Sequence, residues 1–506
     1  MSDIKFGVLR LENARTYGRQ TKKNGKFGKL FFGITPAKCL DVPVKVAYEP
    51  LKAYGKCKDI CNIKKNRFVS YRIINDCEGE RPIANLVENY GPVDDLDALI
   101  KYRFAVKNLE LRPKLGRSMV NAISDIHHQA CMFVRSLNDL EPIPIITIDP
   151  VGCKDIDDGV GIISKSDGTY TISICITHLP SYLMSENISQ DQLVDSLHNP
   201  CSVYLPERTI HMFDETFSLG LFSLSEGKLC PVLCLSVIVN SDGTISDRIL
   251  DVRLATVVKN YSYDSQELYN DSSYRLLQQI TKLCFMKNPV KALDDIYDSH
   301  DLIAYLMILM NSYTAEILYE LNMGIFRLAN PIDNVRIPPE LSSLKHIICN
   351  RASNYVLSSK ISNTPYCHIT SPMRRLPDLI NMIILTKHLY TSVECSKFDK
   401  LIEKSTTNVE TIDQMCRSAK KIGEELSLLY DIYYEKIDLS NLYEAVVIEQ
   451  DQKRSNSYQV YIQDINKWFN VKTTHKLRQY EKVKCRILLF ENAHTLIKKV
   501  RLCLEK

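Results

Sequence analysis

The sequence predicts an α+β protein in which a central domain of segregated strands and helices is flanked by small β-barrels. Three observations support this prediction. Strand-like runs separated by polar turns occupy both ends of the chain, and helical spacing dominates a long central stretch. The third is length, since 506 residues are too many for one ordinary hydrophobic core. We therefore expect domains at residues 1–105, 106–438 and 439–506.

The first domain alternates strand-like runs with turns that contain Gly and Lys. The runs are Phe6–Leu9, Leu30–Ile34, Val44–Tyr48 and Arg67–Ile74. Short runs of this kind fit one or two small barrels of the OB or cold-shock type. Helical spacing then begins after Asp94, because Leu96, Ile100 and Phe104 lie four residues apart, and this change marks the start of the second domain.

The second domain returns to strands and then becomes mostly helical. Its strand-like runs include Pro144–Ile148, Tyr170–Ile176 and Val232–Val239. Residues 265–435 follow helical patterns, for example Leu302–Leu321 and Leu426–Tyr434. Separate blocks of strands and helices are typical of the α+β class.

The third domain has strand-like runs and a set of aromatic side chains. The runs are Tyr443–Glu449, Ser457–Ile462, Lys482–Leu489 and Thr495–Leu502. The aromatics could stack on the bases of a single strand in an oligonucleotide-binding barrel, and they are Tyr458, Tyr461, Trp468 and Phe469. The alternative, that they form the core of the domain, is the more common situation in small β domains.

Charge is distributed unevenly along the chain. Residues 1–40 carry nine Lys/Arg against two Asp/Glu, a net charge of +7, and residues 441–506 carry thirteen against seven, a net +6. Because the whole chain is at +4, the middle is at 4 − 7 − 6 = −9. Basic ends around an acidic centre suit a protein that holds a polyanion at its periphery and performs metal chemistry centrally. Ordinary solvated charged faces are the alternative.

Cysteine usage and hydropathy favour an intracellular protein. The closest pairs among 17 cysteines, Cys57/Cys61 and Cys230/Cys234, lack partners at zinc-site spacing, so we expect reduced, mostly buried thiols. The apolar stretches Leu302–Met310 and Met382–Leu385 are shorter than the ~20 residues of a membrane crossing, and we expect no transmembrane helix. The N-terminus resembles no secretion signal, so we expect a cytoplasmic location, with the nucleus as the alternative.

The most informative stretch is acidic and runs from Ile148 to Val160. It places Asp149, Asp155, Asp157 and Asp158 within ten residues, directly after an apolar strand. Crowded carboxylates repel one another, and a hard divalent cation bound through oxygen would neutralise them. Two such ions can activate water and stabilise a departing oxygen in phosphodiester hydrolysis. The alternative is a solvent-exposed acidic turn, whereas an EF-hand is excluded because Gly159 and Ser166 stand where it needs ligands.

A second stretch, Tyr366–Leu379, supplies positive charge. Arg374 and Arg375 follow Pro372, where we expect a helix to begin, so their guanidinium groups could meet phosphate near a helix N-terminus. A surface salt bridge is the alternative for such an arginine pair.

Together these stretches resemble the ribonuclease II (RNB) family. Residues 149–158 are similar to its motif of a strand-ending Asp, five residues and Asp-x-Asp-Asp, and the Pro-x-Gly-Cys variant is similar to the eukaryotic exosome-type branch. Residues 370–378 resemble Thr-Ser-Pro-Ile-Arg-Arg-Tyr-x-Asp, and residues 202–208 resemble Ser-Val-Tyr-Leu-Pro-Asp-Arg, followed by Phe222-Ser223-Leu224. The resemblance covers residues 120–435; outside them, only the pattern of barrels matches.

The resemblance implies a central RNB catalytic domain and specific roles for these residues. Asp149, Asp155 and Asp158 would bind one or two Mg²⁺ ions, with Mn²⁺ as an alternative. Asp157 would be essential for cleavage, and Arg374 would contact the scissile phosphate. Two further residues would bind the RNA itself, Tyr204 by stacking on the terminal nucleotide and Arg375 along the backbone.

The family's activity is hydrolysis of single-stranded RNA from its 3′ end to 5′-mononucleotides. We expect this activity in a monomer that binds single-stranded RNA, with an RNA-decay complex or a helicase as a further partner. The chain departs from the family pattern at three places: His178, Ala304-Tyr305 and Met382-Ile383. These departures leave open a family member that binds RNA but cleaves it weakly, or a structural subunit of an RNA-decay assembly.

Overall fold

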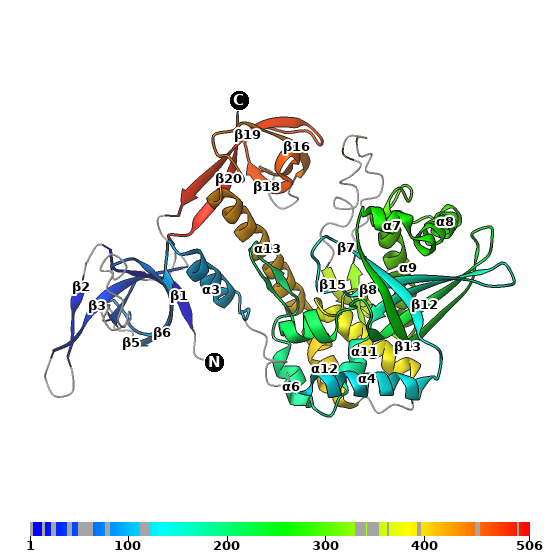
Figure 1. Ribbon diagram of the computed structural model, residues 1–506. Coiled ribbons are helices and arrows are strands. Elements are labelled where there is room, and N and C mark those ends of the chain that lie inside the picture. The colour runs from blue at the N-terminus through cyan, green and yellow to red at the C-terminus, as the bar shows by residue number, and fades with distance from the viewer. Residues whose placement is uncertain are drawn as a thin grey trace. The chain divides into compact units, whose positions relative to one another are not determined.

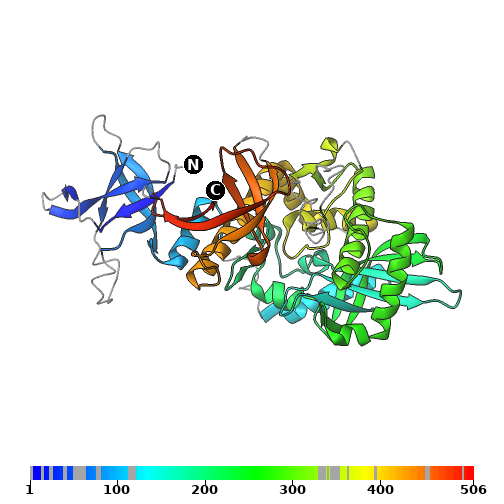
Figure 2. The ribbon, with the colours of Figure 1, turned by 90° about the horizontal axis from the view of Figure 1, so that it is seen from above.

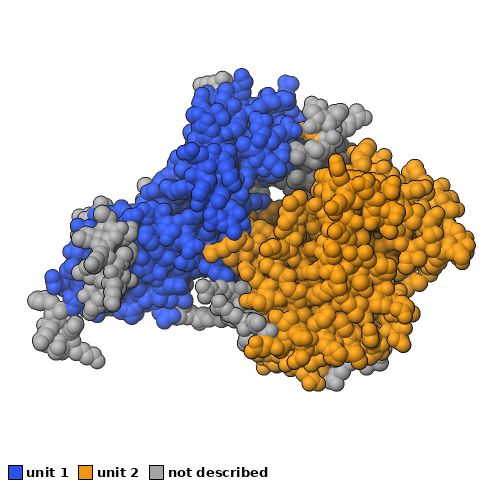
Figure 3. All heavy atoms as spheres, in the orientation of Figure 1, with its two compact units in different colours: residues 1–111, 205–207, 421–506 blue, residues 112–204, 208–420 orange. Residues whose placement is uncertain are grey.

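The computed structural model divides the chain into two compact units, coloured separately in Figure 3. Unit 1 comprises residues 1–111, 205–207 and 421–506, and unit 2 comprises residues 112–204 and 208–420. The residues that the structure describes are 4–12, 16–21, 27–37, 43–48, 64–75, 81–111, 121–328, 338, 341, 354–361, 364–391, 396–450, 456–492 and 495–505. Cys57 and Cys61 lie outside them. The predicted boundaries at residues 105 and 438 remain predictions.

The N-terminal part of unit 1 is a six-stranded sheet in the order β1-β5-β6-β4-β3-β2, drawn in blue in Figure 1. Because β1 also pairs with β3, five of these strands follow one another around a ring. Burial alternates along β4, so that Val44, Val46 and Tyr48 point into the core. The bounds are β1 Lys5–Arg10, β2 Thr16–Thr21, β3 Phe27–Pro36, β4 Val44–Tyr48, β5 Arg67–Asn75 and β6 Ile83–Pro92, followed by helix α3 Leu96–Val106.

The C-terminal part of unit 1 is a five-stranded sheet in the order β18-β17-β16-β19-β20. Tyr458, Tyr461 and Phe469 are buried in it, so these three are core residues, and only Trp468 of the four aromatics is partly exposed. The strand that holds Trp468 was not predicted. The bounds are β16 Tyr443–Gln450, β17 Ser457–Ile462, β18 Lys467–Lys472, β19 Lys482–Glu491 and β20 Lys498–Leu504, after helix α13 Val409–Tyr433.

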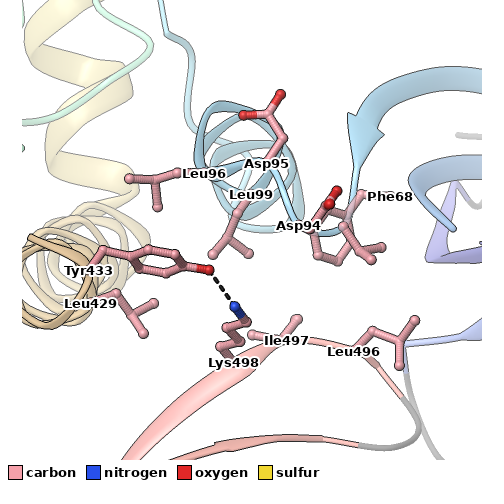
Figure 4. Close-up of a pocket in the computed structure, with 11 residues that line it drawn as sticks. Phe68, Asp94, Asp95, Leu96, Leu99, Leu429, Tyr433, Leu496, Ile497 and Lys498 are labelled. Atoms are coloured by element: carbon pink, nitrogen blue, oxygen red, sulfur yellow. Dashed lines mark hydrogen bonds between the residues drawn. The ribbon is translucent and has the colours of Figure 1, made fainter. Parts of the chain in front are cut away.

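A small pocket within unit 1 is lined by α3, α13 and the start of β20 (Figure 4). Leu99, Leu429 and Ile497 supply apolar walls, while Lys498 Nζ donates a hydrogen bond to the hydroxyl of Tyr433 at its edge. The cationic Lys498 also lies 4.7 Å from the centre of the Tyr433 ring. These contacts tie the end of α13 to the last strand of the sheet.

Unit 2 is built on a closed barrel in the order β12-β13-β7-β8-β9. Its strands pair antiparallel except for β13 and β7, which run parallel. Nearly every residue of β12 is buried, because one face packs inside the barrel and the other is covered by helices such as α4. Figures 1 and 2 show these strands in cyan to green. The bounds are β7 Ile143–Asp149, β8 Asp158–Ser164, β9 Tyr170–Thr177, β12 Leu229–Val239 and β13 Ile245–Ser262.

The remaining elements of unit 2 are mostly helical, as the α+β prediction requires. The helices are α4 Ile123–Leu137, α5 Leu179–Leu183, α6 Gln190–Ser196, α7 Gln266–Asn270, α8 Ser272–Lys287, α9 Ser299–Glu320, α11 Leu376–Leu389 and α12 Asp399–Thr407. Two small antiparallel sheets of two strands each pair β10 Val203–Tyr204 with β11 Thr209–Ile210, and β14 Ile325–Leu328 with β15 Asn354–Leu357. A π-helical turn covers Thr216–Leu221. The predicted fold class, α+β with flanking β-sheet modules, is confirmed.

Helix α9 is long and apolar enough, by length and composition alone, to pass as a membrane span, and among the described residues no other helix is. Half of that window is buried inside the structure, and Leu302, Tyr305 and Met310 belong to the core of unit 2. The described cysteines are free thiols, and six of these eleven are buried, as predicted from their use as small apolar residues.

Candidate active site

The acidic stretch forms the connection between β7 and β8. Asp149 is the last residue of β7 and Asp158 the first of β8, and the two strands pair antiparallel through Ile146 and Val160. The connection can turn back because Gly152 has φ of +81°, a conformation that favours glycine. The strand pairing therefore brings two carboxylates that are nine residues apart to the same end of the barrel.

Asp157 is the buried centre of the site. Its side chain is 2% exposed and accepts two hydrogen bonds, from the Met373 backbone N–H at 3.1 Å and from Arg374 Nε at 3.0 Å. Burial raises the pKa of Asp157 to about 6, against the lowering effect of Arg374. The structure thus joins an arginine to a carboxylate 217 residues away in the sequence. The sequence predicted that the two motifs face one site, but the direct contact of Arg374 with Asp157 was not predicted.

Arg374 keeps part of its guanidinium available while it binds Asp157. Burial lowers its pKa, but the carboxylates of Asp157 and Asp158 more than offset that effect, so the pKa is raised and the group is cationic. Its side chain is 43% exposed. Asp157 holds one edge of the guanidinium group, and the remaining N–H groups can donate hydrogen bonds to a substrate oxygen.

Arg375 occupies a different setting from its neighbour. It precedes α11, which begins at Leu376, and its Nη2 donates to Asp378 Oδ2 at 2.7 Å. Asp378 is fully buried and also accepts the backbone N–H of Ser371 at 2.9 Å. The salt bridge that was the alternative is therefore present for both arginines, Arg374 with Asp157 and Arg375 with Asp378, and in each pair the carboxylate is buried. The role of Arg375 on an RNA backbone remains a prediction.

Tyr204 lies at the edge of the same site. Its ring is 49% exposed, on the short hairpin of β10 and β11. The hairpin is tied to the arginine segment, because the backbone N–H of Ser202 donates to the Arg374 carbonyl at 3.0 Å. Partial removal from solvent raises the pKa of Tyr204 to about 12, although Arg374 lowers it. An exposed ring at this position is not a core residue, and it is free to stack on a ligand.

Asp155 has two neighbours that the motif alone does not reveal. Its Oδ1 lies 3.7 Å from Cys153 Sγ, and its Oδ2 lies 3.8 Å from His211 Nδ1. Burial, with Asp149 and Asp155 nearby, raises the pKa of the Cys153 thiol to about 12. His211 was not predicted, since a lone histidine 56 residues further on carries no local signal.

The carboxylates of Asp149 and Asp158 are only partly compensated, because the charge of Arg374 lowers the pKa of both by less than burial raises it. Burial, followed by the negative charges of Asp149 and Asp157, raises the pKa of Asp158 to about 8, against the lowering effect of Arg374. Burial also raises the pKa of Asp149 to about 6, and its Oδ2 is buried without a hydrogen-bond partner among the described residues. Uncompensated buried carboxylates are unfavourable without a proton or a cation.

The donor atoms and their spacing indicate how well these residues suit a divalent ion. The donor chemistry fits, because Asp149, Asp155 and Asp158 offer only carboxylate oxygens, which hard cations prefer, and Asp149 Oδ2 has no partner. Among the described residues, however, no three His, Cys, Asp or Glu side chains are already grouped as metal ligands. The carboxylates would therefore have to close on an ion to complete its coordination.

The three departures from the family pattern all lie in packed regions. His178 is fully buried, and its ring joins Ser181 Oγ at 2.6 Å to Thr386 Oγ1 at 2.8 Å. Met382 and Ile383 are fully buried in α11. Tyr305 is buried in α9 and donates its hydroxyl to the Asn288 carbonyl at 3.2 Å. These residues serve the core of unit 2.

Comparison with known proteins shows what the acidic part of this site resembles. Residues 137–272 match the family model described as RNB domain. The chain is 34% identical to Ribonuclease R of Ureaplasma parvum serovar 3 over 137 residues. This alignment covers 27% of this chain and 18% of that protein. The predicted resemblance to the RNB family is therefore confirmed for these residues, while the match spans less than a fifth of that relative's length. The likeness to the exosome-type branch remains a prediction.

Two solved structures share the fold. RNase R of Mycoplasma genitalium, in complex with ribose-methylated single-stranded RNA, superposes with a TM-score of 0.68 at 13% identity, over 99% of this chain and 90% of that one. Yeast Ssd1, described as a pseudonuclease, superposes with a TM-score of 0.61 at 12% identity, over 93% of this chain and 65% of that one. The fold therefore occurs both in a ribonuclease and in a pseudonuclease.

Proposed function

We propose that this protein is a divalent-metal-dependent exoribonuclease that degrades single-stranded RNA from its 3′ end and releases 5′-mononucleotides. The observation that carries the proposal is the contact of Arg374 with Asp157 beside three further carboxylates. Hydrolysis of a phosphodiester needs cationic groups where charge develops and carboxylates that hold metal ions. The site offers both within one unit.

Each residue has a proposed role. Asp149, Asp155 and Asp158 would hold one or two Mg²⁺ ions, which activate water and stabilise the leaving oxygen when bound. Arg374 would bind the scissile phosphate with the guanidinium edge that Asp157 leaves open. Asp157 would fix that orientation, and Tyr204 would stack on the terminal base.

The substitution Asp157→Asn tests the proposal. An amide cannot balance the charge of Arg374, so we expect the cleavage rate to fall by roughly 10²–10³-fold, as for the loss of a fixed electrostatic contact. The measurement is the product ladder from a 5′-labelled single-stranded RNA, with Mg²⁺ and with EDTA. Asp195→Asn, an exposed aspartate on α6 in the same unit, is the matched control and should leave the ladder unchanged.

A second function is favoured by one observation. Four of the five positions that depart from the family pattern are buried here, Ala304 being only partly buried, and the pseudonuclease Ssd1 shares the fold. A protein that binds RNA without cutting it would bind the labelled strand tightly yet give no ladder with Mg²⁺ or Mn²⁺. That result would replace the nuclease proposal with an RNA-binding one.

A further inference from the structure

The tripeptide Phe222-Ser223-Leu224 lies against the part of the acidic stretch that carries Asp155 and Asp157. Residues 153–157 belong to no helix or strand, so no regular hydrogen-bond ladder sets the direction of their side chains. Ser223 instead bonds to their backbone from a position 67 to 69 residues further along the chain. The orientation of these carboxylates therefore depends on the tripeptide.

Ser223 holds the backbone on both sides of Asp155. Its Oγ donates a hydrogen bond to the carbonyl of Lys154 at 2.7 Å and accepts one from the N–H of Ile156 at 3.2 Å. The carbonyl belongs to the peptide unit before Asp155, and the N–H belongs to the unit after it. Because peptide units are planar, fixing both of them fixes φ and ψ of Asp155. The hydroxyl group of one fully buried serine thus sets the direction in which this carboxylate leaves the backbone.

Asp157 is held in a similar way, by backbone groups. The N–H of Leu224 donates to the carbonyl of Ile156 at 3.1 Å, in the peptide unit before Asp157. The N–H of Thr177 donates to the carbonyl of Asp157 at 2.8 Å, in the unit after it. Both units that flank Asp157 are therefore fixed, which keeps its carboxylate in place for the contact with Arg374.

The tripeptide can hold the acidic stretch because it is itself anchored. Each of its three carbonyls accepts a hydrogen bond from a side chain. The donors are Thr177 Oγ1 for Phe222 at 2.8 Å, Lys228 Nζ for Ser223 at 3.3 Å and Asn260 Nδ2 for Leu224 at 2.9 Å. Thr177 and Asn260 lie on β9 and β13, so the tripeptide is fixed to the closed barrel of unit 2.

We propose that Ser223 is a positioning residue for RNA cleavage, whose hydroxyl group holds residues 153–157 in the conformation that presents Asp155 and Asp157 to the scissile phosphate. The inference rests on the proposed function, because it assumes that these carboxylates act in cleavage. It goes beyond that function by giving the tripeptide a role in the reaction. Misplacing a reacting group by about 1 Å can cost roughly 10²-fold in rate, so loss of this hydroxyl group should affect turnover more than binding.

The first test measures turnover and RNA affinity separately in the full-length protein. In Ser223→Ala, we expect kcat for a 5′-labelled single-stranded RNA to fall roughly 10–100-fold. The dissociation constant of the same RNA, measured by fluorescence anisotropy in EDTA, should stay close to the wild-type value. General loss of folded protein would instead weaken binding and turnover together.

Hydrogen–deuterium exchange gives a readout that needs no activity. Loss of the hydroxyl group leaves the Ile156 N–H without its acceptor, so the amides of residues 151–160 should exchange faster in Ser223→Ala. The amides of β12 should keep their wild-type exchange rates, because this strand is paired on both sides within the barrel.

Two further variants control the result. Ser218 is also a buried serine, but its hydroxyl group donates to the carbonyl of Phe213 at 3.4 Å. Ser218→Ala should therefore leave kcat and the exchange of residues 151–160 unchanged. Should Ser223→Ala fail to fold, Thr177→Val keeps the side-chain shape and removes the hydrogen bond to the Phe222 carbonyl. It should lower kcat in the same direction by a smaller factor.

The outcomes separate the inference from the function beneath it. A wild type that cleaves RNA, with an alanine variant at position 223 that matches it in kcat or in exchange, would overturn the inference alone. An equal loss of kcat in Ser218→Ala, or a loss of RNA affinity as large as the loss of kcat, would also overturn it. A wild type that gives no product ladder would overturn the proposed function, and the positioning role with it.

Discussion

Single residues in this site differ in how their charge is balanced. Asp157 is hydrogen-bonded to Arg374, whereas Arg374 acts on the pKa of Asp149 and Asp158 only through its charge. Burial raises the pKa of each of these carboxyl groups, and hydrogen bonds oppose that effect at Asp157, from Met373 and Arg374, and at Asp149, from Thr147. The site is therefore organised around one satisfied carboxylate and two that need a proton or a cation.

This imbalance predicts how pH affects the metal-free protein. The pKa of Asp158 is about 8 in the folded chain, above its ordinary value of 3.8. The folded state therefore binds more protons than the unfolded state between these values. The free energy of unfolding should fall as pH rises from about 4 to about 8. We expect a loss of at least about 1 kcal/mol between pH 6 and pH 8 in EDTA, measured by urea unfolding.

The substitution Asp158→Asn should remove most of that dependence, while Asp195→Asn should retain it. Addition of Mn²⁺ at pH 8 should restore stability to the wild type, because an ion that binds only the folded state stabilises it. A metal-free protein whose stability rises from pH 6 to pH 8 would contradict the assignment of uncompensated carboxylates.

At the scale of elements, His178 links two helices of unit 2. Thr386 Oγ1 donates its proton to the Met382 carbonyl at 2.7 Å, so it can only accept from His178 Nε2. His178 Nδ1 is then the acceptor for Ser181 Oγ. Burial lowers the pKa of His178 to about 3, which keeps the ring neutral. The ring thus joins α5 to α11, the helix that follows the arginine segment.

This link predicts that His178 matters for stability. His178→Ala should lower the free energy of unfolding by about 2–4 kcal/mol, because it leaves a cavity and two unpaired hydroxyl groups. His178→Asp should be at least as destabilising, because it buries a carboxylate without a cation. Urea unfolding checks both, and an aspartate variant as stable as the wild type would refute this packing role.

At the scale of the whole molecule, charge is separated along the chain, with +7 and +6 at the two ends and −9 between them. Both basic ends belong to unit 1, and the acidic site belongs to unit 2. In unit 1, Arg501 lies 4.3 Å from the centre of the Phe490 ring, an exposed cation over an aromatic face. Such groups suit the backbone of a single-stranded polyanion.

RNA binding should therefore depend strongly on salt. If the basic ends contact about 4–8 phosphates, a log–log plot of the association constant against salt has a slope of about −3 to −6 for a single strand. Fluorescence anisotropy of a labelled RNA in EDTA measures it without cleavage. Arg501→Glu should make the slope shallower by the amount that roughly one phosphate contact contributes. A slope near zero in the wild type would exclude this electrostatic mode of binding.

Much of this organisation could be predicted from the sequence, and the exceptions have physical reasons. The runs at Pro144–Ile148 and Val232–Val239 match β7 and β12, because long apolar runs must be buried. Strand β18 was not predicted because Lys467 and Asn470 interrupt its apolar pattern. Its strand conformation is stabilised by pairing with β17. The three buried aromatics of this sheet follow the commoner rule that apolar rings fill small cores.

The sequence by itself determined which chemical groups are present: four aspartates beside a strand, and an arginine pair near the start of a helix. Their types and local spacing are enough to indicate metal-assisted phosphate chemistry. Only the tertiary structure decided that Arg374 binds Asp157, that Arg375 binds Asp378, and that His211 faces Asp155. These contacts depend on chain folding and on side-chain rotamers. For Arg374 and His211 the partners also lie far apart in the chain, so no local periodicity in the sequence indicates that they meet.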